Sequence, residues 1–211
     1  MTARITAIDL KVVEQYLDEQ PQVARKAARM AINDTTSRKA IPRFKKSIQD
    51  QVDFPAGYLN EDRFAARKLA TDADLTAIIS ARFRPTSLAR FAGDVSFEGA
   101  KKAGGVKVRV NRGGAGKTMK GAFFVKLRRG KDTADGFNVG LAIRLKPGQK
   151  LRGRRKGGTG VRLAEDLYLL YGPSVDQVFT DVSTADSPYV AEQLEREFIR
   201  QWVRLSAEEL K

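Results

Sequence analysis

The stretch Phe137–Leu145, FNVGLAIRL, carries the clearest structural signal in the sequence and decides the fold class. Apolar side chains occupy every second position of it, at Phe137, Val139, Leu141, Ile143 and Leu145. A period of two predicts a β-strand with one buried face and one wet face. Because strands of this kind are typical of antiparallel sheets, we expect an antiparallel sheet here.

Other segments on both sides of this strand share the β pattern. Val106, Val108 and Val110 alternate with Lys107 and Arg109. The apolar, partly β-branched stretch Leu75–Phe83 ends before Arg84 and Pro85, and proline cannot donate to a strand ladder. Gly121–Leu127 and Val161–Leu169 are weaker candidates for strands.

Helical periodicity brackets the β region. Near the N-terminus, Val23, Ala27, Met30 and Ala31 fall on one face of a helix that Pro21 is suited to begin. Pro42 is expected to kink or split that helix, and an earlier short helix over Ile8–Leu17 fits the pattern. At the other end, Ser187 and Pro188 suit the start of a helix. Its expected apolar stripe is Val190, Leu194, Phe198, Trp202 and Leu205.

The chain has 211 residues, which favours one domain. We therefore predict a single α+β domain over residues 1–211. Residues 1–70 form its helical N-terminal part, residues 74–170 its antiparallel sheet with long basic, glycine-rich loops, and residues 174–211 its amphipathic C-terminal helix.

The composition argues against most kinds of catalysis. The sequence has no Cys and no His, which removes thiolate and imidazole chemistry and their metal sites. The acidic pairs Glu165–Asp166 and Asp72/Asp74 do not converge with other functional groups. We expect no enzyme activity, no catalytic residue, no metal and no cofactor. No apolar run approaches the roughly 20 residues of a membrane span, and no signal peptide is evident, so no membrane partner is expected.

The positive charge is concentrated in the middle of the chain. The net charge is +14, yet residues 100–162 alone hold 19 Lys or Arg against two Asp, a net charge of +17. Fourteen of the 18 glycines lie in the same segment. A glycine-rich segment of one sign repels itself until it meets an acidic surface, a phosphate backbone or another subunit.

Gly113–Thr118, GGAGKT, resembles part of a phosphate-binding P-loop with Lys117 as its lysine. The first glycine of that signature is replaced by Asn111, and a helix should follow Thr118, where the sequence favours a loop and a strand. We expect a flexible glycine turn and no nucleotide binding.

The cluster Lys150–Lys156, KLRGRRK, leaves three interpretations open. It is a set of phosphate contacts, a solvated hairpin loop, or a basic arm that docks on an acidic neighbouring subunit. The candidate residues for subunit or DNA contact in the basic loops are Arg112, Lys117, Lys120, Arg128, Arg129, Lys150, Arg152, Arg154, Arg155 and Lys156.

Four short motifs together resemble a known family. They are Ala31–Thr35 (AINDT), Arg84–Phe91 (RPTSLARF), Gly121–Phe123 (GAF) and Leu170–Val175 (LYGPSV). Their order and spacing are similar to those of the prophage minor tail protein Z family, the tail-completion proteins of long-tailed bacteriophages. The resemblance spans roughly residues 23–182, and departs at Pro42 and in the Gly/Arg loops, where subunit contacts are expected to differ.

The resemblance implies a virion structural protein that completes the head-proximal end of the tail and helps form the neck. It implies tail terminator, tail tube and head–tail connector proteins as partners, with six copies of the chain by analogy and contact with packaged DNA. Its location would be the virion, and the host cytoplasm during assembly. The alternative is a nucleic-acid-binding protein whose basic region, residues 100–162, makes sequence-independent phosphate contacts.

The motif residues are expected to be structural. Gly172 and Pro173 suit a turn, and Ser174 suits the N-cap of a short helix over Val175–Thr180. The residues assigned to structural motifs are Arg84, Pro85, Leu88, Phe91, Tyr171, Gly172, Pro173 and Ser174.

Overall fold

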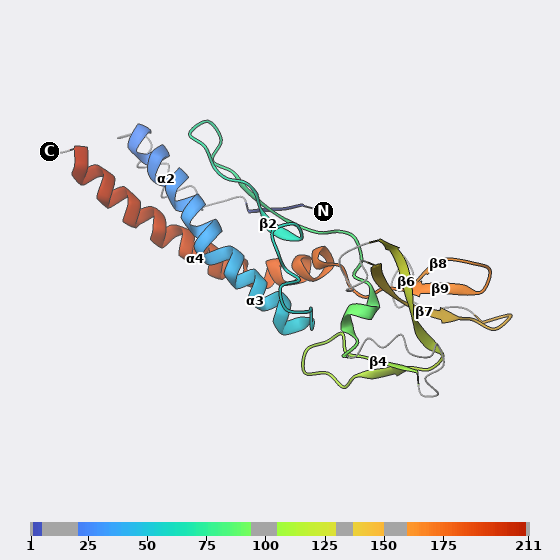
Figure 1. Ribbon diagram of the computed structural model, residues 1–211. Helices are drawn as coiled ribbons and strands as arrows, with labels where there is room; N and C mark the ends of the chain where they lie inside the picture. Colours follow the sequence, from blue (N-terminus) through green and yellow to red (C-terminus); the bar gives the residue numbers. More distant parts are fainter. Residues whose placement is uncertain (1, 6–20, 94–104, 130–136, 150–159, 210–211) are drawn as a thin grey trace. The chain divides into compact units, whose positions relative to one another are not determined.

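The computed structural model describes residues 2–5, 21–93, 105–129, 137–149 and 160–209 (Figure 1). The chain divides into two compact units, each described by itself below. Unit 1 combines Met1–Ile48, Leu59–Phe83 and Val175–Lys211, and unit 2 combines Gln49–Tyr58 and Arg84–Ser174. Helices accompany antiparallel sheets, so the predicted α+β class is confirmed. The expected helix over Ile8–Leu17 lies outside the described residues.

In unit 1, helix α2 (Pro21–Thr35) packs along helix α4 (Val175–Glu209), as Figure 1 shows. Val23, Ala27 and Ala31 are buried and cluster with Leu194 and Phe198 of α4. The small alanine side chains let the two backbones approach closely, and burial of the apolar stripe stabilises the pair. Over its described residues the helix buries the face that the sequence predicts.

A π-helical segment, η1 (Thr36–Ala40), connects α2 to helix α3 (Ile41–Gln51). The backbone N–H of Ile41 donates to the carbonyl of Thr36, five residues back. Pro42 follows at once and has no N–H to continue a regular ladder. The helix is therefore not split at Pro42. The disturbance takes the form of a wider turn that ends two residues before the proline.

Helix α4 contradicts the prediction that the C-terminal helix begins at Ser187. It begins at Val175, after Ser174 as expected, but runs through Pro188 to Glu209. The Ser187 hydroxyl donates to the carbonyl of Ser183 (2.7 Å) and so is no N-cap. Buried residues lie on both sides of the proline, such as Val182 and Val190. Their burial offsets the roughly 3 kcal/mol that proline costs inside a helix.

The small sheet of unit 1 has the strand order β1–β3–β2, with antiparallel pairs throughout. Its strands are β1 (Thr2–Ile5), β2 (Phe64–Lys68) and β3 (Ala77–Ala81). The ring of Phe179 from α4 meets Phe64 of β2 at 4.9 Å and Phe44 of α3 at 5.2 Å, both edge-on. Strands β1 and β2 lie inside residues 1–70, which the sequence led us to expect as helical.

Unit 2 holds a four-stranded antiparallel sheet of order β6–β7–β9–β8. Its strands are β6 (Ala122–Arg129), β7 (Phe137–Arg144), β8 (Gly160–Arg162) and β9 (Leu167–Leu170). The expected single strand over Val161–Leu169 is thus a hairpin of two strands.

Strand β7 is the one that the alternating stretch predicts, but its second face is not wet. Leu141 and Ala142, which point to opposite faces, are both fully buried. At Gly140, an added Cβ would lie 2.7 Å from Leu169 Cδ2. The Leu169 side chain of the neighbouring strand β9 therefore covers this glycine. The reason is position, because β7 is an inner strand of the sheet.

A second hairpin in unit 2 pairs β4 (Val106–Val108) with β5 (Lys117–Met119). Val106 and Val108 are buried, whereas Lys107 between them is exposed, as the alternation predicts. The turn before β5 contains Gly113 at φ +72°, which favours glycine. Because Thr118 lies in a strand and no helix follows it, GGAGKT is a hairpin turn and not a P-loop.

Candidate docking site

Two of the sequence motifs, Arg84–Phe91 and Leu170–Val175, meet in unit 2 although they lie far apart in the sequence. Ser87 and Tyr171 form an antiparallel bridge, and the N–H of Gly172 donates to the carbonyl of Thr86 (2.8 Å). The Ser87 hydroxyl donates to the carbonyl of Val139 on β7 (3.2 Å). These bonds fix the short 3-10 helix η2 (Leu88–Phe91) to the sheet.

Gly172 allows this approach because it has no side chain. A Cβ there would lie 2.8 Å from Phe91 Cε2 and 3.5 Å from Leu88 Cδ1, and both residues are buried. Arg84 and Pro85 are exposed, and Ser174 is buried directly before α4. The motif residues thus lie in a structural junction.

Aromatic packing extends the junction to a segment that the sequence did not single out. The Tyr58 hydroxyl donates to Thr86 Oγ1 (3.0 Å), and both groups are buried. Phe54 stacks on Tyr58 at 5.2 Å and contacts Phe91 at 5.6 Å. The residues Asp53–Ala56 are thereby held beside η2.

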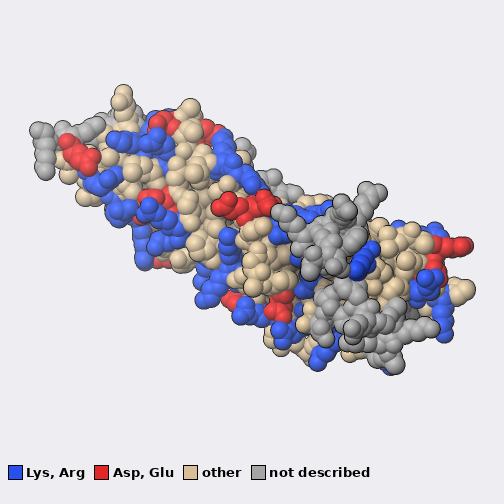
Figure 2. All heavy atoms as spheres, viewed as in Figure 1, with Lys and Arg blue, Asp and Glu red and all other residues tan. Residues whose placement is uncertain are grey.

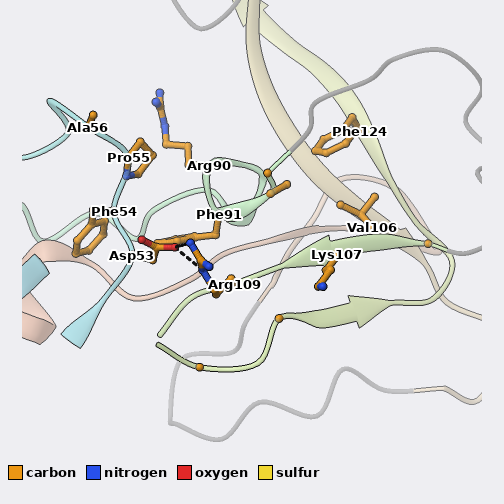
Figure 3. Close-up of a pocket in the computed structure, with 15 residues that line it drawn as sticks. Asp53, Phe54, Pro55, Ala56, Arg90, Phe91, Val106, Lys107, Arg109 and Phe124 are labelled. Carbon is orange, nitrogen blue, oxygen red and sulfur yellow. Dashed lines mark hydrogen bonds and ion pairs between the residues drawn. The ribbon is translucent and has the colours of Figure 1, made fainter. Parts of the chain in front are cut away.

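A cavity of about 890 Å³ lies between this segment, η2 and the β4–β5 hairpin (Figure 3). Phe54, Phe91, Val106 and Phe124 supply its apolar wall, and Gly93, Gly105, Gly114 and Gly116 line it with backbone. Its volume falls within the range of about 300–1,000 Å³ typical of ligand pockets.

Three cations line the same cavity: Arg90, Lys107 and Arg109. Among the described residues, Asp53 is the one acid that lines the cavity, and it pairs with Arg109 at 2.6 Å and 2.7 Å (Figure 3). The Arg90 guanidinium lies 5.4 Å from the centre of the Tyr58 ring. The cavity therefore presents an excess of positive charge beside an apolar wall.

The predicted contact residues lie mostly outside this cavity. Arg112 donates to the carbonyl of Gln49 (3.3 Å), and Lys117 and Lys120 are exposed on the hairpin and the turn after it. Arg128 and Arg129 end β6, and their side chains are not described. The cluster Lys150–Lys156 lies outside the described residues.

Sequence reasoning therefore missed the lining cations. Lys107 and Arg109 stood out only as the polar positions of a strand, and Arg90 only as part of a motif. The alternation of Lys107 and Arg109 with valines was the signal that could have found them, because it places both side chains on one face.

The remaining motif, Ala31–Thr35, is also structural. Asn33 clamps Ala70 through two hydrogen bonds, one from its amide to the Ala70 carbonyl (3.0 Å) and one to its carbonyl oxygen from the Ala70 N–H (2.7 Å). Asp34 accepts a hydrogen bond from Gln201 of α4 (3.3 Å). A hydrogen bond from Arg200 lowers the pKa of Glu197 beside this pair.

Charges in unit 1 are interleaved. Figure 2 shows Asp and Glu side chains among the Lys and Arg side chains over α2 and α4. Glu192 pairs with Arg196 and Asp72 pairs with Arg29 (2.9 Å). The described residues include no cluster of three or more groups able to hold a metal ion, and their helices include none suited to cross a membrane.

Neither family models, nor curated proteins, nor solved structures give a match to this chain.

Proposed function

We propose that the chain is a structural subunit of a bacteriophage virion that completes the head-proximal end of the tail and forms part of the neck. It acts by docking on neighbouring subunits and catalyses no reaction. Its partners are the tail terminator, tail tube and head–tail connector proteins, and several copies act together, six by analogy with the tail.

The observation that carries this proposal is the junction of Arg84–Phe91 with Tyr171–Ser174. These motifs underlie the resemblance to the tail-completion family, and in this chain they are joined by hydrogen bonds and by the contact of Gly172 with Phe91. The residues of these motifs pack against one another and hold the local backbone in place. Such a role fits a protein that presents a fixed surface to its neighbours. The cavity beside the junction supplies a surface for a neighbour.

A deletion in the parent phage tests the proposal. We expect particles made without this chain to separate into filled heads and unattached tails, with infectivity restored by the chain supplied in trans. The measurements are electron microscopy of lysates and mass spectrometry of purified virions. Joined heads and tails in its absence, or virions that lack the chain, would contradict the proposal.

Nucleic-acid binding is a second candidate, favoured by one observation. Residues 105–129 contain eight Lys or Arg and no acid, and Lys117 and Lys120 are exposed. If these side chains contact phosphates, the logarithm of the binding constant for duplex DNA should fall linearly with the logarithm of the salt concentration. The slope should be about −0.9 for each phosphate contact. Binding of a labelled duplex at several salt concentrations tests it, with Lys117→Gln/Lys120→Gln as the variant expected to flatten that slope.

A further inference from the structure

Lys107 is the cation of the unit 2 cavity best placed to meet a ligand. Its stem lies across Gly116, where a Cβ would come within 2.8 Å of Lys107 Cε. Among the described residues it has no ion-pair partner, whereas Asp53 is occupied by Arg109. A carboxylate brought to the cavity would therefore find at its edge an ammonium that no described carboxylate pairs with.

The apolar wall favours a protein segment over a nucleic acid as the occupant. Phe54, Phe91 and Val106 offer burial to an aliphatic side chain, which a phosphodiester backbone lacks. The suited ligand is an exposed turn that carries an apolar side chain next to a carboxylate.

The tip of the β8–β9 hairpin has this chemistry. Leu163 is 48% exposed and Val161 is 56% exposed, both large for apolar side chains at a sheet edge. Glu165 is exposed and has no ion-pair partner among the described residues, whereas Asp166 pairs with Arg144 (2.9 Å). One apolar side chain and one available carboxylate thus stand two residues apart.

Hydrogen bonds hold this tip in one shape. The N–H of Leu163 donates to the Leu167 carbonyl (2.8 Å), and that of Leu145 donates to the Asp166 carbonyl (2.8 Å). Arg162 reaches over the turn and donates to the carbonyls of Ala164 (3.2 Å) and Glu165 (3.0 Å). A rigid turn loses little conformational entropy when it docks.

We infer that the hairpin tip of one copy, with Leu163 and Glu165, inserts into the Lys107 cavity of a second copy. Leu163 packs on the phenylalanine wall, and the Glu165 carboxylate pairs with the Lys107 ammonium. The inference rests on the proposed function in one respect, namely that several copies act together in an assembly.

The tip does not reach the cavity of its own chain. Within unit 2, Figure 1 draws the β8–β9 hairpin and β4 well apart, the hairpin at the right-hand end in orange. Because the contact joins two different surfaces of the chain, copies can dock head to tail. Contacts of this type generate rings when the rotation closes, as a collar of identical subunits requires.

Cysteine cross-linking tests the contact without background, because the chain has no cysteine. Thr118 lies opposite Lys107 in the β4–β5 hairpin, and Ala164 lies between Leu163 and Glu165. The variants Thr118→Cys and Ala164→Cys therefore place thiols beside the contact and keep the charges of Lys107 and Glu165. The two purified variants, of different tag length, are mixed and treated with a short bismaleimide. We expect a heterodimer yield about tenfold above that of Ala164→Cys mixed with Thr184→Cys, which places the thiol on α4.

Charge exchange adds the decisive arm. Lys107→Glu in the Thr118→Cys chain should reduce the cross-link to the control yield, and Glu165→Lys in the Ala164→Cys chain should then restore it. A yield at control level with both native charges, or one indifferent to Lys107→Glu, overturns the inference. So does protection of the Thr118→Cys thiol by duplex DNA without a cross-link, which would make the cavity a nucleic-acid site.

These outcomes separate the inference from the proposed function. A failed cross-link removes the contact between copies but leaves the deletion phenotype and the presence of the chain in virions as they are. A clear cross-link by a chain that virions lack overturns the proposed function alone.

Discussion

Unit 1 and unit 2 use charge in opposite ways. In unit 1, acids and bases face each other across α2, α3 and α4, as in the contact of Arg43 with Asp186 (2.8 Å). In unit 2, the described lining of the cavity places Arg90, Lys107 and Arg109 around one acid, Asp53. Balanced pairs are suited to holding helices together, whereas unbalanced charge is available to a partner. Under the proposed function, unit 1 is the scaffold and unit 2 carries the interaction surface.

The largest expected effect breaks unit 1 at its aromatic centre. Phe179 is 2% exposed between Phe44 and Phe64, and Phe179→Ala should lower the free energy of unfolding by about 3–5 kcal/mol. Urea unfolding followed by circular dichroism measures it. Phe83→Ala, at a side chain that is 70% exposed, is the control and should change stability by less than about 0.5 kcal/mol.

The ion pair on α4 is the next point at which unit 1 can be broken. Asp186 is buried and accepts hydrogen bonds from Arg43 Nε (2.9 Å) and Ser47 Oγ (2.6 Å). Asp186→Asn should therefore cost about 2 kcal/mol in the same unfolding measurement. Asp181→Asn changes an exposed acid on the same helix and should have almost no effect; equal losses in the two variants would argue against the pairing.

A smaller, local effect is expected in unit 2. Gly172→Ala forces a Cβ against Phe91 and should cost about 1–2 kcal/mol. In this variant, hydrogen exchange should rise at the amide of position 172 and in η2 while unit 1 stays protected. Gly93→Ala, where a Cβ meets no atom within 4 Å, is the matched control. Uniform loss of protection across the whole chain would show that the units do not respond separately.

The smallest effect concerns pH. The hydrogen bond from Arg200 lowers the pKa of Glu197 below its ordinary value of 4.5, so the charged form stabilises the folded state. That contribution is present above pH 4.5 and is lost as the pH falls through the lowered pKa. Glu197→Gln should reduce Tm by about 1 °C at pH 7 and leave it unchanged below the lowered pKa. A difference that persists in acid would contradict the charge explanation.

Local sequence patterns predicted a helix or strand correctly where its tertiary contacts favour the same structure. The alternation around Leu141 places β7 correctly, and the stripe from Val23 to Ala31 identifies the buried face of α2. The same rules misplaced the start of α4, because burial on both sides of Pro188 outweighs the local cost of proline. Propensity is a local quantity, and this balance is set by contacts distant in sequence.

The cavity could not be predicted for the same reason. Its described lining comes from five stretches of the chain, near Asp53, Arg90, Lys107, Gly116 and Phe124. The ion pair of Asp53 with Arg109 alone joins residues 56 positions apart. A single sequence shows the positive charge of the region but not which cations converge. Lys117 and Lys120 were chosen for their glycine-rich setting, yet neither lines the cavity.

The unbroken course of α4 has a mechanical consequence. A helix of 35 residues is about 52 Å long. A continuous helix of this length transmits a displacement at one end to the other end. Pro188 removes the backbone donor that would meet the carbonyl of Thr184, which leaves one turn more compliant than the rest. Under load, the helix should flex at that turn before it melts elsewhere.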